Sequence, residues 1–322
     1  MGGCNSVFEM TSNTWHPERE IEIVAGTPPG GGLDRSARAL VKAIESNRLL
    51  EVPVRVNNVA GDGGRKAWAY LEQHRADPHV VSISSANLTT DHLLGSAAFR
   101  HEAAFTPLAI LYTEYIAFVA RADSALKSGA DLLARVRADA GSLTIALSTS
   151  LGNPNHIAVA KVLRQAGTEV RAPAMRVFDS ALDATADVVA GRADIGAVTA
   201  ASPVREIANG TLRALAVSAP RRLDGLYANT PTWREQSVDC VIGAWRGVTG
   251  TRGITAAQIA FWEKLLAAIA ATDEWKAELA RHYWTAMPLA GGPLWDHLER
   301  ERAEMQVALG ELGLLRGMRD EG

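Results

Sequence analysis

The stretch Thr27-Pro28-Pro29-Gly30-Gly31-Gly32-Leu33-Asp34 joins an apolar segment, residues 21–25, to a segment with apolar residues at helical spacing. The first segment predicts a strand, and the second predicts a helix capped by Asp34. Three successive glycines leave backbone N–H groups uncovered at the start of this helix, where they have no partner within the helix and the helix dipole is positive. The stretch therefore predicts a site that binds a small anion.

The same order of strand, polar loop and helix repeats along the chain. Further strands are predicted at residues 52–56, 79–84, 110–120, 143–147, 195–198, 212–218 and 240–249. A second glycine turn occupies residues 58–64, and the polar loop Ser84-Ser85-Ala86-Asn87 follows the third strand. This alternation predicts a parallel sheet covered by helices, with its ligand at the polar loops.

After residue 120 the pattern restarts, which predicts a second α/β lobe and a cleft between the two. Asn153 is expected to cap the helix that follows the loop at 148–156, with Pro154 at its first position. Asp179 or Ser180 is expected to cap the next helix. Beyond residue 255 the chain is expected to be mostly helical and to return to the first lobe.

Bulk composition excludes several classes of protein. The 322 residues carry a formal net charge of −3, with 47% hydrophobic and 21% charged residues, which is ordinary for a globular protein. This balance is not that of a nucleic-acid-binding protein, and no stretch approaches the roughly 20 apolar residues that span a bilayer. A disulfide between Cys4 and Cys240 is not expected. Residues 1–18 are expected to be a disordered or vector-derived tail without a secretory signal.

The glycine turns leave open an alternative, an α/β enzyme that binds a phosphate-bearing substrate. Val56-Asn57-Asn58 stands where an acidic residue would bind ribose, and the first turn does not follow G-x-G-x-x-G. There is no G-x-S-x-G nucleophile elbow, the histidines lack metal-ligand spacing, and His156 is expected to bond a neighbouring loop. Arg65-Lys66 is either a solvated surface pair or a cation aimed at an acidic ligand. Catalysis is thus poorly supported.

These loops resemble those of the Bug (TctC-like) solute receptors of tripartite tricarboxylate transporters. The family's A-P-G-G-x-x-D is similar to the stretch ending at Asp34, and its N-x-x-G-A-G-G is similar to residues 58–64, with Asp62 in place of alanine. Its S-x-x-x-G-T-P-x-H is similar to residues 148–156, with Asn153 in place of threonine. Matches follow in order at 191–194, 210–217, 231–235 and 245–247, so the resemblance covers about residues 20–315.

The resemblance implies an α/β, two-lobed periplasmic binding protein of type II-like architecture, each lobe a sheet flanked by helices, with the ligand cleft between the lobes. Residues 19–121 and 223–318 would form lobe 1, and residues 122–222 lobe 2. The protein would capture a small carboxylate in the periplasm and deliver it to a tripartite tricarboxylate-type transporter, or act with a sensor kinase. It would be a monomer and not an enzyme, with no cofactor, metal or nucleic acid.

The substrate-binding residues that the resemblance implies lie in loops of both lobes. Backbone N–H groups near Gly30 and Gly31 would bind the carboxylate, and hinge closure would bury it. The residues are Thr27, Pro29, Gly30, Gly31, Gly32, Ser85, Asn87, Ser148, Thr149, Ser150, Gly152, Asn153, Ser180, Ala181 and Thr199.

Two positions depart from the family's pattern and are expected to select the ligand. Phe178-Asp179-Ser180 stands in place of Y-[KR]-G, and Val198 stands where the family often has Asp. Because valine offers no acceptor to an ammonium group, we expect that the receptor does not select an amino group. Asp179 would repel a second carboxylate or recognise a hydroxyl group.

Overall fold

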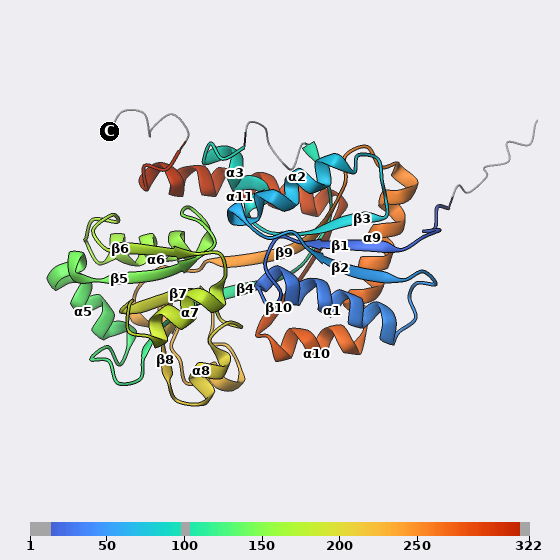
Figure 1. Ribbon diagram of the computed structural model, residues 1–322. Helices are drawn as coiled ribbons and strands as arrows, with labels where there is room; N and C mark the ends of the chain where they lie inside the picture. The colour runs from blue at the N-terminus through green and yellow to red at the C-terminus, as the bar shows by residue number, and fades with distance from the viewer. Residues whose placement is uncertain (1–13, 98–103, 316–322) are drawn as a thin grey trace, which may run out of the picture.

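The structure is a computed structural model that describes residues 14–97 and 104–315. Two groups of strands, each with helices packed on it, lie side by side and are joined by long strands (Figure 1). Most of the predicted tail, Cys4 and residues 316–318 of the predicted lobe 1 lie outside the described residues. Within the described ranges, no helix has the length and apolar character needed to cross a membrane.

The first group is built on three parallel strands, as predicted. β1 (Ile21–Ala25) lies between β2 (Val54–Asn58) and β3 (Val80–Ser84). All five residues of β1 are buried, which explains why its sequence is nearly a continuous apolar run. The connecting helices are α1 (Gly32–Ser46), the short η1 (Asp62–Gly64), α2 (Arg65–Gln73) and α3 (Asn87–Leu93).

The second group repeats this arrangement. β5 (Thr144–Ser148) lies between β6 (Ala174–Phe178) and β7 (Ile195–Thr199), again in parallel. β6 was not predicted from the sequence, because this edge strand is largely exposed and lacks an apolar run. The helices of this group are α5 (Gly129–Asp139), α6 (Pro154–Gln165), α7 (Ala181–Val189) and α8 (Val204–Ala208).

Two long strands join the groups into one sheet. β4 (Thr106–Arg121) pairs along its first part with β9 (Gly243–Gly250) and along its last part with β7 and β8 (Leu212–Val217). The strand order is β2-β1-β3-β9-β4-β7-β5-β6. The loops at the carboxyl ends of β1 and β5 therefore come from opposite halves of a single sheet.

The expectation that the chain is mostly helical beyond residue 255 was incomplete. Between α10 (Asp273–Arg281) and α11 (Gly291–Glu311) the chain forms β10 (Trp284–Ala290), which pairs antiparallel with β4. The register shifts between Ala286 and Leu289, around Pro288. Because proline cannot donate to a strand ladder, it weakened the sequence signal for this strand. The helix before α10 is α9 (Ala256–Ala271).

The last helix, α11, packs on both groups. Leu294 and Leu298 near its start lie in an apolar cluster with Val24 of the first group. Met305 and Leu309 near its end lie in the main apolar cluster of the second group. The lobe boundaries at 121/122 and 222/223 stay a prediction, and α11 is in contact with both groups whichever lobe it is assigned to.

Candidate functional site

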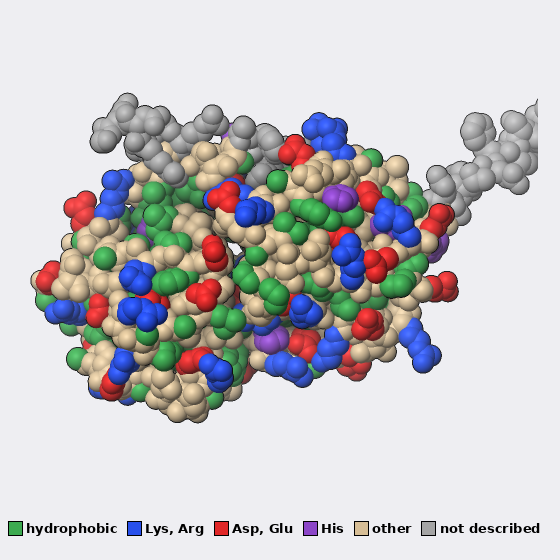
Figure 2. Space-filling model, in the orientation of Figure 1, with side chains coloured by type: hydrophobic (Ala, Val, Ile, Leu, Met, Phe, Trp, Pro, Cys, Tyr) green, Lys and Arg blue, Asp and Glu red, His purple; other side chains and the backbone are tan. Residues whose placement is uncertain are grey.

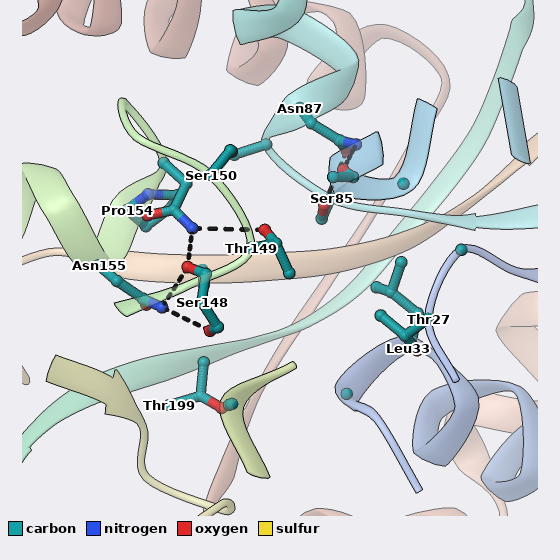
Figure 3. Close-up of a pocket in the computed structure, with 18 of the residues that line it drawn as sticks. Thr27, Leu33, Ser85, Asn87, Ser148, Thr149, Ser150, Pro154, Asn155 and Thr199 are labelled. Carbon is teal, nitrogen blue, oxygen red and sulfur yellow. Dashed lines mark hydrogen bonds between the residues drawn. The ribbon is translucent and has the colours of Figure 1, made fainter. Parts of the chain in front are cut away.

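A cavity of about 70 Å³ lies where loops of the two groups meet. Figure 2 shows the surface hollowed between the groups. Figure 3 shows Thr27, Leu33, Ser85 and Asn87 on one side, facing Ser148, Thr149, Asn155 and Thr199 on the other. Pockets for drug-sized ligands measure roughly 300–1,000 Å³, so this cavity suits a much smaller molecule.

Asp34 holds the first glycine loop in place. Its buried carboxylate accepts hydrogen bonds from the Gly30 N–H (2.8 Å), Asn58 Nδ2 (2.9 Å) and Arg38 Nε (2.9 Å). Burial alone would raise the pKa of Asp34, but the hydrogen bonds from Arg38, Gly30 and Asn58 outweigh it and hold the pKa below its usual range. The prediction that Asp34 caps α1 was wrong, because the cap residue is Gly31.

The bonds inside this loop decide which N–H groups a ligand can reach. The Gly30 N–H is bound to Asp34, the Gly31 N–H donates to the Pro28 carbonyl (2.9 Å), and Pro29 has no N–H. The cavity lining includes none of Pro29, Gly30 and Gly31. The expectation that Gly30 and Gly31 present free donors to the carboxylate is therefore corrected.

The available donors lie one residue further along the chain. Gly32 and Leu33 line the cavity, and within the described residues their N–H groups meet no acceptor. They belong to the first turn of α1, whose N–H groups have no partner inside the helix. The positive end of the α1 dipole thus faces the cavity.

Two helices of the second group begin at the same cavity. Ser180 caps α7 by accepting from the Asp183 N–H (3.1 Å), while the Ala181 N–H has no partner in the described part of the chain. Asn153 caps α6, with Pro154 at the first position, as predicted. Because α1, α6 and α7 all begin here, their dipoles together favour a bound anion.

Hydroxyl groups complete the wall on the side of the second group. Asn155 Nδ2 donates to both the carbonyl and the Oγ of Ser148, each at 3.0 Å. Because the Ser148 Oγ accepts this bond, its proton remains free to donate. Thr149 accepts from Asn153 Nδ2 (3.4 Å) in the same way, so both hydroxyls can donate to a carboxylate.

The structure brings most of the predicted residues together. Those that line the cavity are Thr27, Gly32, Ser85, Asn87, Ser148, Thr149, Ser150, Asn153, Ser180, Ala181 and Thr199. Gly152 lies outside the lining: its φ is +81°, and a Cβ there would be 2.6 Å from Leu94, so it allows close packing between the groups. That the lining residues bind the ligand stays a prediction.

Sequence reasoning missed several lining residues, namely Gly26, Leu33, Gly63, Gly64, Ala86, Pro154, Asn155, Ala244 and Arg246. Most are neighbours of predicted residues in the same loops. Arg246 is different, because it lies within β9 and is the only charged residue among the described residues of the lining. The match to the family at residues 245–247 did not indicate that Arg246 lines a cavity. Its position there depends on the pairing of β9 with β4.

The two residues expected to select the ligand are not in the lining. Val198 is fully buried in an apolar cluster with Ala117 and Val119. Asp179 is exposed. Their departures from the family pattern therefore do not change the cavity wall directly.

Other polar candidates have structural roles. Arg65 forms an ion pair with Asp62, lies 3.8 Å from Asp91 and is not in the lining, so it is not aimed at a ligand in the cavity. His156 Nδ1 accepts from the Gly152 N–H (3.0 Å), as expected of a loop-bonding histidine, and burial lowers its pKa to about 4. Across residues 14–97 and 104–315, no three His, Cys, Asp or Glu side chains are grouped to hold a metal ion.

Comparison with known proteins identifies the family. Residues 37–275 match the family model described as tripartite tricarboxylate transporter family receptor, TctC. The chain is 29% identical over 204 residues to the "UPF0065 protein in tcbD-tcbE intergenic region" of Pseudomonas sp. strain P51, covering 63% of this chain and 59% of that protein. The aligned part is thus less than two thirds of that relative's length.

Solved structures share the fold. The periplasmic binding protein BugD has a TM-score of 0.83 at 18% identity, covering 93% of this chain and 99% of that one. A Rhodopseudomonas palustris protein with adipate has a TM-score of 0.82 at 20% identity, covering 92% and 98%. The predicted two-lobed α/β fold is therefore confirmed.

The family model describes a transporter receptor, so the alternative of a phosphate-binding enzyme has no support. The matched residues, 37–275, make up well over half of the chain and contain most of the cavity lining. The resemblance inferred from the glycine loops is thus confirmed, and the chain belongs to the tripartite tricarboxylate transporter receptor family, TctC.

Proposed function

We propose that this protein is a solute-binding receptor that captures a small carboxylate between its two lobes and delivers it to a tripartite tricarboxylate-type transporter. The observation that carries the proposal is the convergence of the starts of α1, α6 and α7 on one small cavity. One carboxylate would accept from the Gly32 and Leu33 N–H groups on one side and from Ala181 and Ser148 on the other. Groups from both lobes would thus hold the same anion, which favours the closed form.

The comparisons support this chemistry. A structural relative is described with adipate, a linear dicarboxylate. We propose that the lobes are residues 19–121 with 223–318, and residues 122–222, and that the receptor acts as a monomer in the periplasm. A transporter is the proposed partner because the family is named for one; a sensor kinase would recognise the same closed form.

The proposal is tested by ligand binding to the full chain. Thermal-shift measurements would use mono- and dicarboxylates of three to six carbons, with NAD and ATP as the alternative class. A ligand at 100 times its Kd should add roughly 2.7 kcal/mol to the unfolding free energy. Stabilisation by an acid supports the proposal, and stabilisation by NAD or ATP alone contradicts it.

A matched pair of variants locates the site. Ser148→Ala removes a hydroxyl of the cavity wall, and Ser142→Ala removes an exposed hydroxyl of the same lobe. A hydrogen bond to a charged group contributes about 1.5–3 kcal/mol, so Ser148→Ala should weaken acid binding by about 10-fold or more. Equal affinity in the two variants would place the ligand elsewhere.

A further inference from the structure

One residue of the cavity wall, Arg246, forms an ion pair that the carboxylate site described above does not use. Arg246 of β9 lies with its Nη2 2.7 Å from Oε1 of Glu114 on β4. The Glu114 side chain is 1% exposed and also accepts from Trp284 Nε1 (3.2 Å). A buried carboxylate thus balances the charge of the one arginine that the described lining contains.

Each partner of this pair keeps one buried atom without a hydrogen bond. Arg246 Nη1 donates to the Trp245 carbonyl (3.0 Å), but Arg246 Nε finds no acceptor among the described residues. Glu114 Oε1 accepts no hydrogen bond of normal geometry from the described residues, although Nη2 is close. Arg246 Nε is therefore a buried donor without an acceptor among the described residues, which is costly, and Glu114 Oε1 is held by its ion pair alone.

Gly32 leaves the pair open to the cavity. A Cβ placed on Gly32 would lie 3.7 Å from Arg246 Nη2 and 3.9 Å from Glu114 Oε1. Gly32 and Arg246 both line the cavity. Because Gly32 has no side chain, this position leaves open the approach from the cavity to Arg246, directly or through one water molecule, and a group bound there lies next to the Glu114 carboxylate.

Among carboxylate, ammonium, methyl and hydroxyl groups, only the hydroxyl group satisfies both partners. A carboxylate would accept from Arg246 but would be repelled by Glu114, and an ammonium group would be repelled by Arg246. A methyl group would leave both atoms unsatisfied. A hydroxyl group donates and accepts, so it can bond to Glu114 and Arg246 together.

We propose that Arg246 and Glu114 make this receptor select an acid that carries a hydroxyl group at the end away from its bound carboxylate. The inference rests on the proposed function, because it assigns the second half of the same ligand. Arg246 supplies the donor and Glu114 the acceptor, and Glu114 also opposes a second negative charge. Arg246 and Glu114, and not Asp179 or Val198, then determine which ligand is selected.

The test compares acids that differ only in their terminal group. Three matched sets have three, four and six carbons: 3-hydroxypropionate, propionate and malonate; 4-hydroxybutyrate, butyrate and succinate; 6-hydroxyhexanoate, hexanoate and adipate. Dissociation constants are measured by calorimetry on the full chain. In the set that fits the cavity, we expect the hydroxy acid to bind about 10-fold or more tighter than either relative, since hydrogen bonds to charged groups are worth at least a factor of ten.

Variants then assign the preference to the pair. Glu114→Gln keeps an acceptor for Trp284 and removes the balancing charge, so the preference for hydroxyl over carboxylate should fall by about 10-fold or more. Arg246→Gln replaces the charged donor by a neutral one and leaves Glu114 as the acceptor, so the preference for the hydroxy acid over the alkyl acid should fall by about fivefold. Arg205→Gln, at a side chain that is 88% exposed, is the control and should change neither ratio. Ratios of affinities are used because they do not depend on the fraction of folded protein.

The outcomes separate the two proposals. The wild type could bind an acid of one set but bind its alkyl acid or its dicarboxylic acid more tightly than its hydroxy acid. In that case the inference is wrong and the proposed function stands. Unchanged ratios in Glu114→Gln or Arg246→Gln also overturn the inference. If none of the nine acids binds and NAD or ATP alone stabilises the chain, the proposed function fails together with the inference.

Discussion

Removing the Asp34 carboxylate tests whether this side chain holds the first glycine loop in place. Asp34 is 1% exposed and accepts bonds from Gly30, Asn58 and Arg38. Asp34→Ala would leave the Gly30 N–H and one Asn58 proton without an acceptor, at about 1–3 kcal/mol for each unsatisfied group. The Arg38 side chain is 58% exposed, so its ion pair contributes only about 0–1 kcal/mol. We expect the free energy of unfolding to fall by about 3 kcal/mol at pH 7.

The assay is urea denaturation followed by tryptophan fluorescence and circular dichroism, with coincident curves as the check on two-state behaviour. Arg38→Gln is the matched control, because it removes only the exposed partner and should cost less than about 1 kcal/mol. A loss in Asp34→Ala no larger than in Arg38→Gln would refute the reasoning. It would mean that the loop holds its shape without the carboxylate.

The same carboxylate predicts a pH dependence. Burial alone would raise the pKa of Asp34, but bonds from Arg38, Gly30 and Asn58 hold the folded-state pKa below the ordinary value of 3.8. A carboxyl group with a lowered pKa stabilises the fold when the pH is above its ordinary, unfolded-state pKa. This contribution is lost as the pH falls through the folded-state pKa. The stability difference between wild type and Asp34→Ala should therefore be constant from pH 7 to about 5 and shrink below about pH 4. A difference that shrinks on raising the pH from 5 to 7 would contradict this sign.

Three further outcomes are expected. Ser202→Ala removes the acceptor of Arg35 Nη2 (3.2 Å), a bond between the two groups of strands and helices, and should weaken acid binding by about 2- to 10-fold in calorimetry, with Ser142→Ala unchanged. Gly152→Ala, at φ +81° and with its Cβ 2.6 Å from Leu94, should lower the free energy of unfolding by about 2–4 kcal/mol, and a loss under 1 kcal/mol would count against the close packing. Burial raises the pKa of the Cys240 thiol to about 12, so iodoacetamide at pH 8 should alkylate it only in denaturant, as mass spectrometry of its peptide would show.

Much of the fold could be predicted because its signals are local. β1 and β5 are short apolar runs between polar loops, and the caps of α6 and α7 are set by Asn153 and Ser180 next to them. β6 and β10 escaped prediction for physical reasons. β6 is exposed at the sheet edge, and β10 contains Pro288 at a register shift.

The candidate site was predicted in outline and corrected in detail. The glycine loop does lie at the cavity, but the N–H groups of Gly30 and Gly31 donate hydrogen bonds to Asp34 and Pro28. The three glycines are identical in the sequence, so the sequence alone does not tell which of them has a free N–H group. That depends on the path of the backbone. Gly32 became the available donor because it begins α1.

By itself, the sequence determined that this chain is an α/β protein with glycine-rich and polar loops after its strands, and the order of those loops identified its family. Those features depend on residues within a few positions of one another. Only the tertiary structure decided that Arg246 faces the cavity, that Glu114 balances its charge, and that α11 packs on both groups. These contacts join residues far apart in the chain, and they form only when β4, β9 and the last helix are packed together.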